Sequence, residues 1–150
     1  MTDSNISMID ISDKVDNLRI AKAVGKIILK KSTIQLIKGK KVKKGDVLSN
    51  AELAAINAVK KTPDFIFLAH PIPIMGVNSS FEIEDSSISV TVEVKSLGKT
   101  GVELEALMGV QIALLTIWDM TKYVEKDDKG QYPDTKIVEV KVVKKTKENM

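Results

Sequence analysis

Residues 98–124 read GKTGVELEALMGVQIALLTIWDMTKYV, and this stretch decides how the chain folds. From residue 102 to residue 120 nearly every position is apolar, which predicts one long helix that is buried on all sides. Thr100 is a favourable N-cap, and Glu103 three residues later would complete a capping box. The start of the stretch resembles the end of a phosphate-binding loop. We reject that motif, because Glu93 stands where it requires a glycine.

The carboxylates in this helix are the first candidates for function, because a carboxylate among apolar residues is costly unless it is paired. Capping would explain Glu103, but it leaves Glu105 unexplained. Asp119 and Lys122 are three residues apart and lie side by side on a helix, which is most often a simple ion pair. The apolar residues before Asp119 would move the pKa values of both groups toward neutrality, which suits acid–base chemistry.

Spacing limits how these carboxylates can act together. Glu105 and Asp119 are fourteen residues apart, so they share a helix face but lie roughly 20 Å apart. Either the substrate is long, or one site joins the start of this helix in one chain to its end in another. We predict a symmetric homo-oligomer in which the Asp119 end of one chain meets a cluster of Glu105, Lys44 and His70 in its partner.

The rest of the chain predicts strands and helices around this long helix. Alternating apolar residues indicate a hairpin over residues 81–94, turning at 85–87. Ser32 and Asp46 are expected to cap two further helices. A short apolar strand at 65–69 would close at His70. The remaining expected elements are strands at 19–30 and 136–144 and helices at 33–38 and 47–61.

This order of elements predicts the fold class. Strand, helix, strand, strand, helix, strand is the split βαβ arrangement of an α+β, ferredoxin-like sandwich, with an antiparallel sheet and helices on one face. The 150 residues suffice for a single domain, 1–150, in which 1–7 and 146–150 are expected to be flexible tails.

Composition narrows the class of function. The chain has no cysteine and only one histidine, which excludes disulfides, thiolate metal sites and histidine metal clusters. A net charge of +3 suits an anionic ligand and falls short of a nucleic-acid-binding tail. The apolar run interrupted by Gln111 is judged too short to span a bilayer, and the N-terminus carries no signal-peptide pattern. We therefore expect a cytoplasmic protein with neither membrane nor nucleic-acid partners.

Five stretches of the chain resemble the MoaC family, the cyclic pyranopterin monophosphate synthases of molybdenum cofactor biosynthesis. They occur in family order and cover nearly all of the chain from residue 8 to about residue 126. These stretches are MIDIS at 8–12, KGDV at 44–47, LAHP at 68–71, GKTGVELEAL at 98–107 and LTIWDMTK at 115–122.

The resemblance implies a lyase that converts a cyclic dihydroguanosine triphosphate into cyclic pyranopterin monophosphate and pyrophosphate. A radical enzyme that cyclises GTP would supply this substrate. The family fold is ferredoxin-like, and its hexamer, a trimer of dimers, shares sites between subunits. The resemblance places catalytic roles on Asp119, Lys122, Lys44 and His70. It places substrate-binding roles on Leu68, Ala69, His70, Glu103, Leu104, Glu105, Lys14, Arg19 and Lys145.

The chain also departs from the family pattern. Ala69 replaces the usual cysteine before the histidine, Met108 replaces a common threonine, and the loop at 126–134 is longer. A lysine-rich tail that includes Lys145 replaces a glycine-rich one. We expect no cofactor, although the sequence leaves open whether magnesium accompanies the triphosphate. The alternative function is a non-catalytic nucleotide- or RNA-binding ferredoxin-like oligomer, but the sheet strands offer little aromatic surface beyond Phe81.

Overall fold

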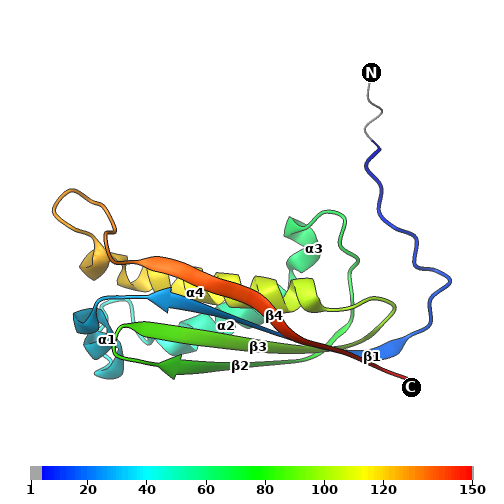
Figure 1. The fold of residues 1–150 in the computed structure, drawn as a ribbon, viewed down its shortest axis with the longest axis horizontal. Helices are drawn as coiled ribbons and strands as arrows, with labels where there is room; N and C mark the ends of the chain where they lie inside the picture. Colours follow the sequence, from blue (N-terminus) through cyan, green and yellow to red (C-terminus); the bar gives the residue numbers. More distant parts are fainter. Residues whose placement is uncertain (1–4, 150) are drawn as a thin grey trace.

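The computed structural model describes residues 5–149 and has the predicted α+β architecture. Four antiparallel strands form one sheet in the order β2-β3-β1-β4, and α2 and α4 lie on the same face of it (Figure 1). This strand order is that of the ferredoxin-like split βαβ fold. The elements are β1 (Asn17–Ile28), α1 (Lys31–Lys38), α2 (Val47–Lys60), α3 (Thr62–Phe65), β2 (Ile74–Ile83), β3 (Ser87–Gly98), α4 (Glu103–Glu125) and β4 (Lys136–Glu148).

The core lies between the sheet and α4. One face of α4 buries Val110, Leu114 and Ile117, and α4 packs on β1, on β3 and along α2. Strand β3 alternates as the sequence predicts, because Val90 and Val92 are fully buried on the helix side. The pairing of Phe81 with Val90 confirms the hairpin and its register.

The expectation that α4 is buried on all sides is wrong for the single chain. The sheet covers one side of the helix and α2 a second, which leaves Leu115 53% exposed. The sequence prediction concerned only the apolar run interrupted by Gln111; the whole of α4 is long and apolar enough to cross a membrane by length and composition alone. Half of its most apolar window is buried within the fold, which is the packing of a core helix.

Helix capping follows the sequence prediction at one of three sites. The Asp46 carboxylate accepts a hydrogen bond from the Ser49 amide at 3.2 Å and caps α2 as expected. The predicted capping box of α4 is wrong, because the helix begins at Glu103 and its N-cap is Val102. The Ser32 cap is also wrong, because α1 has already begun at Lys31.

Two segments also differ from the predictions, one in its type of structure and one in where it ends. The apolar run at 65–69 is not a strand: α3 ends at Phe65, and the turns that follow leave Phe67 83% exposed. Pro63 in the first turn of α3 favours that helix. Strand β4 extends to Glu148, so residues 146–148 of the predicted flexible tail pair with β1. Residues 1–4 and 150 of the predicted tails lie outside the described part of the chain.

Candidate functional site

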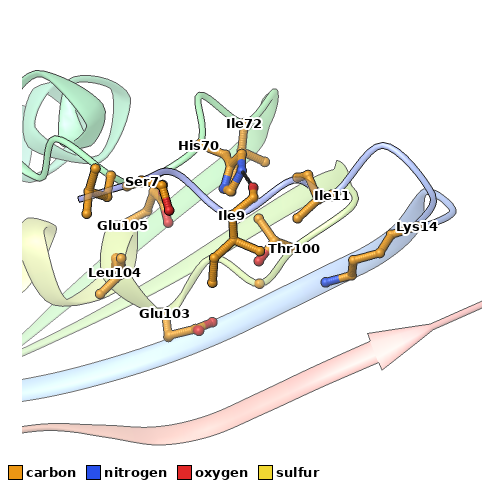
Figure 2. A pocket seen from close by; sticks show the side chains of 13 residues that line it. Ser7, Ile9, Ile11, Lys14, His70, Ile72, Thr100, Glu103, Leu104 and Glu105 are labelled. Carbon is orange, nitrogen blue, oxygen red and sulfur yellow. Dashed lines mark hydrogen bonds between the residues drawn. The ribbon is translucent and has the colours of Figure 1, made fainter. Parts of the chain in front are cut away.

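A pocket of about 350 Å³ lies at the start of α4, and we call it the amino-end pocket. Figure 2 shows that its walls come from segments far apart in sequence: the N-terminal segment, the turn that ends in His70, and the first turn of α4. It contains most of the predicted substrate-binding residues. Its lining residues are Ser7, Ile9, Ile11, Lys14, Leu68, Ala69, His70, Ile72, Thr100, Gly101, Glu103, Leu104 and Glu105.

Two carboxylates in this pocket have different surroundings. Glu105 is only 3% exposed, and its burial, reinforced by the nearby charge of Glu103, raises the pKa of its carboxyl group. Glu103 Oε1 accepts from Lys145 Nζ at 3.3 Å. Its Oε2 is buried and has no hydrogen-bond partner within residues 5–149. The pocket therefore holds an unused acceptor beside a carboxyl group that is biased toward its neutral form.

His70 holds the N-terminal segment across the amino-end pocket. Its Nε2 lies 2.6 Å from the Ile9 carbonyl oxygen, and because a carbonyl can only accept, the ring nitrogen donates (Figure 2). Lys99 Nζ adds a longer bond of 3.4 Å to the Ser12 carbonyl. In this arrangement His70 positions the wall of the pocket.

The other predicted catalytic residues lie at the far end of α4, in what we call the carboxyl-end cluster. Lys44 Nζ lies 3.0 Å from one carboxylate oxygen of Asp119, and Lys122 Nζ lies 3.2 Å from the other. The side chain of Asp119 is 56% exposed. The hydrogen bonds from Lys44 and Lys122 hold the pKa of Asp119 below its ordinary value. The predicted shift toward neutrality is therefore wrong for Asp119, because two ammonium groups outweigh its slight desolvation.

The loop before α2 places Lys44 beside Asp119. Tyr123, one turn beyond Asp119 on α4, accepts a hydrogen bond from the Lys43 amide at 2.9 Å, and the Lys43 ammonium lies 5.4 Å from the Tyr123 ring centroid. Gly45 follows with φ of +117°, a conformation that favours glycine. The loop is thereby attached to α4 on one side of Lys44 and turned sharply on the other.

The structure corrects how the predicted site residues are grouped. The sequence prediction places Lys44 beside Glu105 and His70, but it lies with Asp119, because the loop that carries it packs on the end of α4 rather than its start. Arg19 is buried in β1, where its Nε donates to the Gly98 carbonyl at 3.4 Å, and it is not among the residues that line the amino-end pocket. Apart from Arg19, the sequence-predicted residues thus form two groups, one at each end of α4.

Sequence reasoning missed several residues that line the two sites. Ser7 belongs to the predicted flexible tail, and Ile9 belongs to the family-like stretch at 8–12, to which no site role was assigned beforehand. At the other end, a second pocket of about 360 Å³ contains Tyr132, which belongs to a charged loop. The only feature of the sequence that pointed to Tyr132 is that it is an aromatic residue in an otherwise polar stretch. Within residues 5–149, no three His, Cys, Asp or Glu side chains are grouped as a metal site would require.

Comparison with known proteins identifies the family. The model of the MoaC family matches residues 8–148. The chain belongs to the MoaC family. The matched region includes both ends of α4 and therefore both groups of candidate residues.

Curated members of the MoaC family are similar to this chain over nearly its whole length. A "Probable cyclic pyranopterin monophosphate synthase" of Pyrococcus furiosus is 54% identical over 97% of this chain and 94% of its own. A protein with the same name from Archaeoglobus fulgidus is 53% identical over 97% and 93%. A "Probable cyclic pyranopterin monophosphate synthase accessory protein" of Methanothermobacter thermautotrophicus is 50% identical over 97% and 91%.

Proposed function

We propose that this MoaC-family protein is a lyase of molybdenum cofactor biosynthesis, a cyclic pyranopterin monophosphate synthase. It converts a GTP-derived cyclic dihydroguanosine triphosphate into cyclic pyranopterin monophosphate and releases pyrophosphate. The observation that carries this proposal is the carboxyl-end cluster, in which one carboxylate lies between two ammonium groups on a family-matched stretch. Near-full-length similarity to proteins with that printed name supports it.

Asp119, Lys44 and Lys122 carry the proton transfers in this mechanism. The reaction opens the five-membered ring of the guanine by hydrolysis and closes a pterin ring, so protons must leave some nitrogen and oxygen atoms and reach others. An ionised Asp119 accepts a proton, and a lysine within 3.2 Å donates one. An aspartate carboxylate is ionised at neutral pH, and the flanking Lys44 and Lys122 ammonium groups favour that form, so we assign Asp119 the role of proton acceptor.

The remaining predicted residues bind the substrate. Lysines neutralise the triphosphate, so that pyrophosphate can leave as the cyclic phosphate forms. Lys14 and Lys145 supply positive charge at the amino-end pocket, which Glu103 also lines. Leu68, Ala69, His70, Leu104 and Glu105 line the same pocket. Arg19 retains the triphosphate role that the family resemblance implies. The proposal assigns no cofactor to the protein, and it leaves open whether magnesium arrives with the triphosphate.

One complete site requires two subunits in this proposal. The two groups of residues lie at opposite ends of α4, roughly 20 Å apart, which is too far for one small substrate. Leu115 and Phe67 are largely exposed, which leaves apolar surface for a neighbouring copy to cover. We propose a hexamer, a trimer of dimers, in which the carboxyl-end cluster of one chain completes the amino-end pocket of its partner. The proposed enzyme acts in the cytoplasm, after a radical enzyme that cyclises GTP.

Subunit mixing tests the shared site. Asp119→Asn damages the carboxyl-end group and His70→Ala the amino-end group, and each variant alone should be nearly inactive. Random exchange between equal amounts should restore about a quarter of wild-type activity, because half of the dimers are mixed and each mixed dimer has one intact site. Asp119→Asn mixed with Lys44→Ala should stay inactive, because both changes fall in the same group. Recovery in that second mixture, or none in the first despite proven exchange, contradicts the shared site.

Direct turnover tests the function itself. Wild-type protein is given the cyclic dihydroguanosine triphosphate, and the pterin product and pyrophosphate are quantified. Asp119→Asn should lower turnover by about 10²–10⁴-fold, because it keeps the shape of the side chain but cannot accept the proton. Asp85→Asn, in the exposed β2–β3 turn, is the matched control and should retain full turnover. Nucleotide binding without turnover would favour the non-catalytic alternative.

A further inference from the structure

The second pocket, at the carboxyl end of α4, has a wall that the proton-transfer chemistry does not use. The rings of Trp118 and Tyr132 meet edge to face, with centroids 5.1 Å apart and planes inclined by 62°. Both rings line a cavity of about 360 Å³ and remain only partly buried. Asp119 and Lys122 line the same cavity, so an aromatic surface lies beside the ion pair.

The loop that carries Tyr132 is held in a defined shape. The Asp127 carboxylate accepts hydrogen bonds from the amides of Lys129 and Gln131, each at 2.9 Å. The Asp127 amide donates to the Gln131 carbonyl at 2.9 Å, and Gly130 turns the chain with φ of +76°. This network precedes Tyr132 directly and fixes the backbone from which its ring projects.

A buried carboxylate fastens the base of the same loop. Glu125, the last residue of α4, is fully buried, and its carboxylate accepts from the Thr135 hydroxyl at 2.6 Å. It also accepts from the Lys30 amide at 3.1 Å and from the Thr33 hydroxyl. Both ends of the loop are thus attached to the core, which keeps Tyr132 beside Trp118 and the reactive cluster.

We propose that Tyr132 is a specificity-determining residue, whose ring contacts the flat guanine-derived ring of the substrate against Trp118 while Asp119 and Lys122 face the edge of that ring. This inference rests on the proposed function. Binding sites typically combine an apolar or aromatic surface with a few placed polar groups. Here the aromatic pair supplies the surface. The carboxylate accepts ring N–H groups, and the ammonium group donates to ring nitrogen or oxygen atoms.

The Trp118–Tyr132 contact does more than hold the loop of residues 126–134 against α4. A purely structural pair would gain most from burying both rings, yet both rings retain exposed surface on a cavity that also holds two charged side chains. A half-buried tyrosine that shares a cavity with an ion pair suits a ligand that offers both a π-face and a polar edge. Inorganic triphosphate has neither of these, so the aromatic wall should discriminate between ligands that carry the ring and ligands that carry only phosphates.

The experiment compares two probes, GTP and inorganic triphosphate, by calorimetric titration of the full-length protein in its native assembly. Tyr132→Ala should raise the Kd for GTP by about 5- to 150-fold, the range for loss of one stacked aromatic ring. Its Kd for inorganic triphosphate should not change. Tyr132→Phe keeps the ring and should bind GTP within about twofold of wild type. Gln131→Ala, the neighbouring loop residue, is the matched control and should behave as wild type.

Trp118 provides an independent readout, because it is the only tryptophan in the chain. Saturating GTP should change its fluorescence emission in the wild-type protein. Unchanged emission at saturation, unchanged GTP affinity in Tyr132→Ala, or an equal loss for GTP and triphosphate would each overturn the proposal. A Tyr132→Phe variant as weak as Tyr132→Ala would assign the effect to the hydroxyl and overturn it as well.

The inference and the proposed function fail separately. If wild type forms the pterin and Tyr132→Ala binds GTP normally, the inference about Tyr132 is wrong and the proposed function stands. If wild type forms no pterin but Tyr132→Ala weakens GTP binding selectively, the proposed reaction is wrong, and the inference that Tyr132 contacts the ring of the ligand is supported.

Discussion

Replacing Glu125 with alanine should destabilise the fold far more than its place at a helix end suggests. The carboxylate satisfies three donors, the Lys30 amide and the hydroxyls of Thr33 and Thr135, and both threonines are buried. A buried donor left without an acceptor costs about 1–3 kcal/mol. Since the hydroxyls can turn toward other acceptors, we take the lower limit for each donor and predict a loss of about 3 kcal/mol.

Thermal and urea unfolding measure this loss. For a chain of this size, 3 kcal/mol corresponds to a decrease in Tm of about 6–12 °C. Glu125→Gln keeps the volume and one acceptor oxygen, so it should lose less than Glu125→Ala. Glu52→Ala, on an exposed face of α2, is the control and should change the free energy of unfolding by no more than about 0.5 kcal/mol. A Glu125→Ala protein within 1 kcal/mol of wild type would refute this reasoning.

Two further predictions concern the pocket and the core. Because burial raises the pKa of Glu105 above its unfolded value, its stabilising contribution is complete below the unfolded pKa and is lost as the pH rises through the folded pKa. Glu105→Gln should therefore flatten the fall in unfolding free energy as the pH rises from about 4 toward neutrality, and it should be the more stable protein at neutral pH, as measured by urea unfolding. Gly25→Ala should cost about 1–3 kcal/mol, because its Cβ would lie 2.7 Å from Val110 Cγ1 and 2.9 Å from Leu114 Cδ1. In Gly76→Ala, where the added Cβ meets nothing within 4 Å, the Tm should stay near that of wild type.

Much of the fold was predicted from patterns of residue type within a few positions of one another. The alternation of Val90 and Val92 identified the buried face of a strand, and a hairpin turn set its register. The three-residue spacing of Asp119 and Lys122 predicted that their side chains meet, and they lie 3.2 Å apart. Each of these predictions depends on backbone geometry that repeats within a few residues, so the neighbouring sequence contains enough information.

Helix termini and segment exposure were predicted less well. The motif of Thr100 and Glu103 satisfied the sequence rule for a capping box, yet Glu103 instead pairs with Lys145, forty-two residues further along the chain. Phe67 belongs to an apolar run that favours a buried strand, but its side chain is exposed because the sheet is completed by other segments. A local rule fails where a distant residue competes for the same group or the same place.

The sequence by itself determined the α+β class, the strand order along the chain, the apolar helix and the residue types available for acid–base chemistry. Only the tertiary structure decided which of the candidate site residues lie next to one another. Lys44 reaches Asp119 from seventy-five residues away, and Tyr132 reaches Trp118 through a loop whose base is attached to Glu125. The reason is physical: periodicity follows from local backbone geometry, whereas a site depends on which distant surfaces bury one another when the core forms.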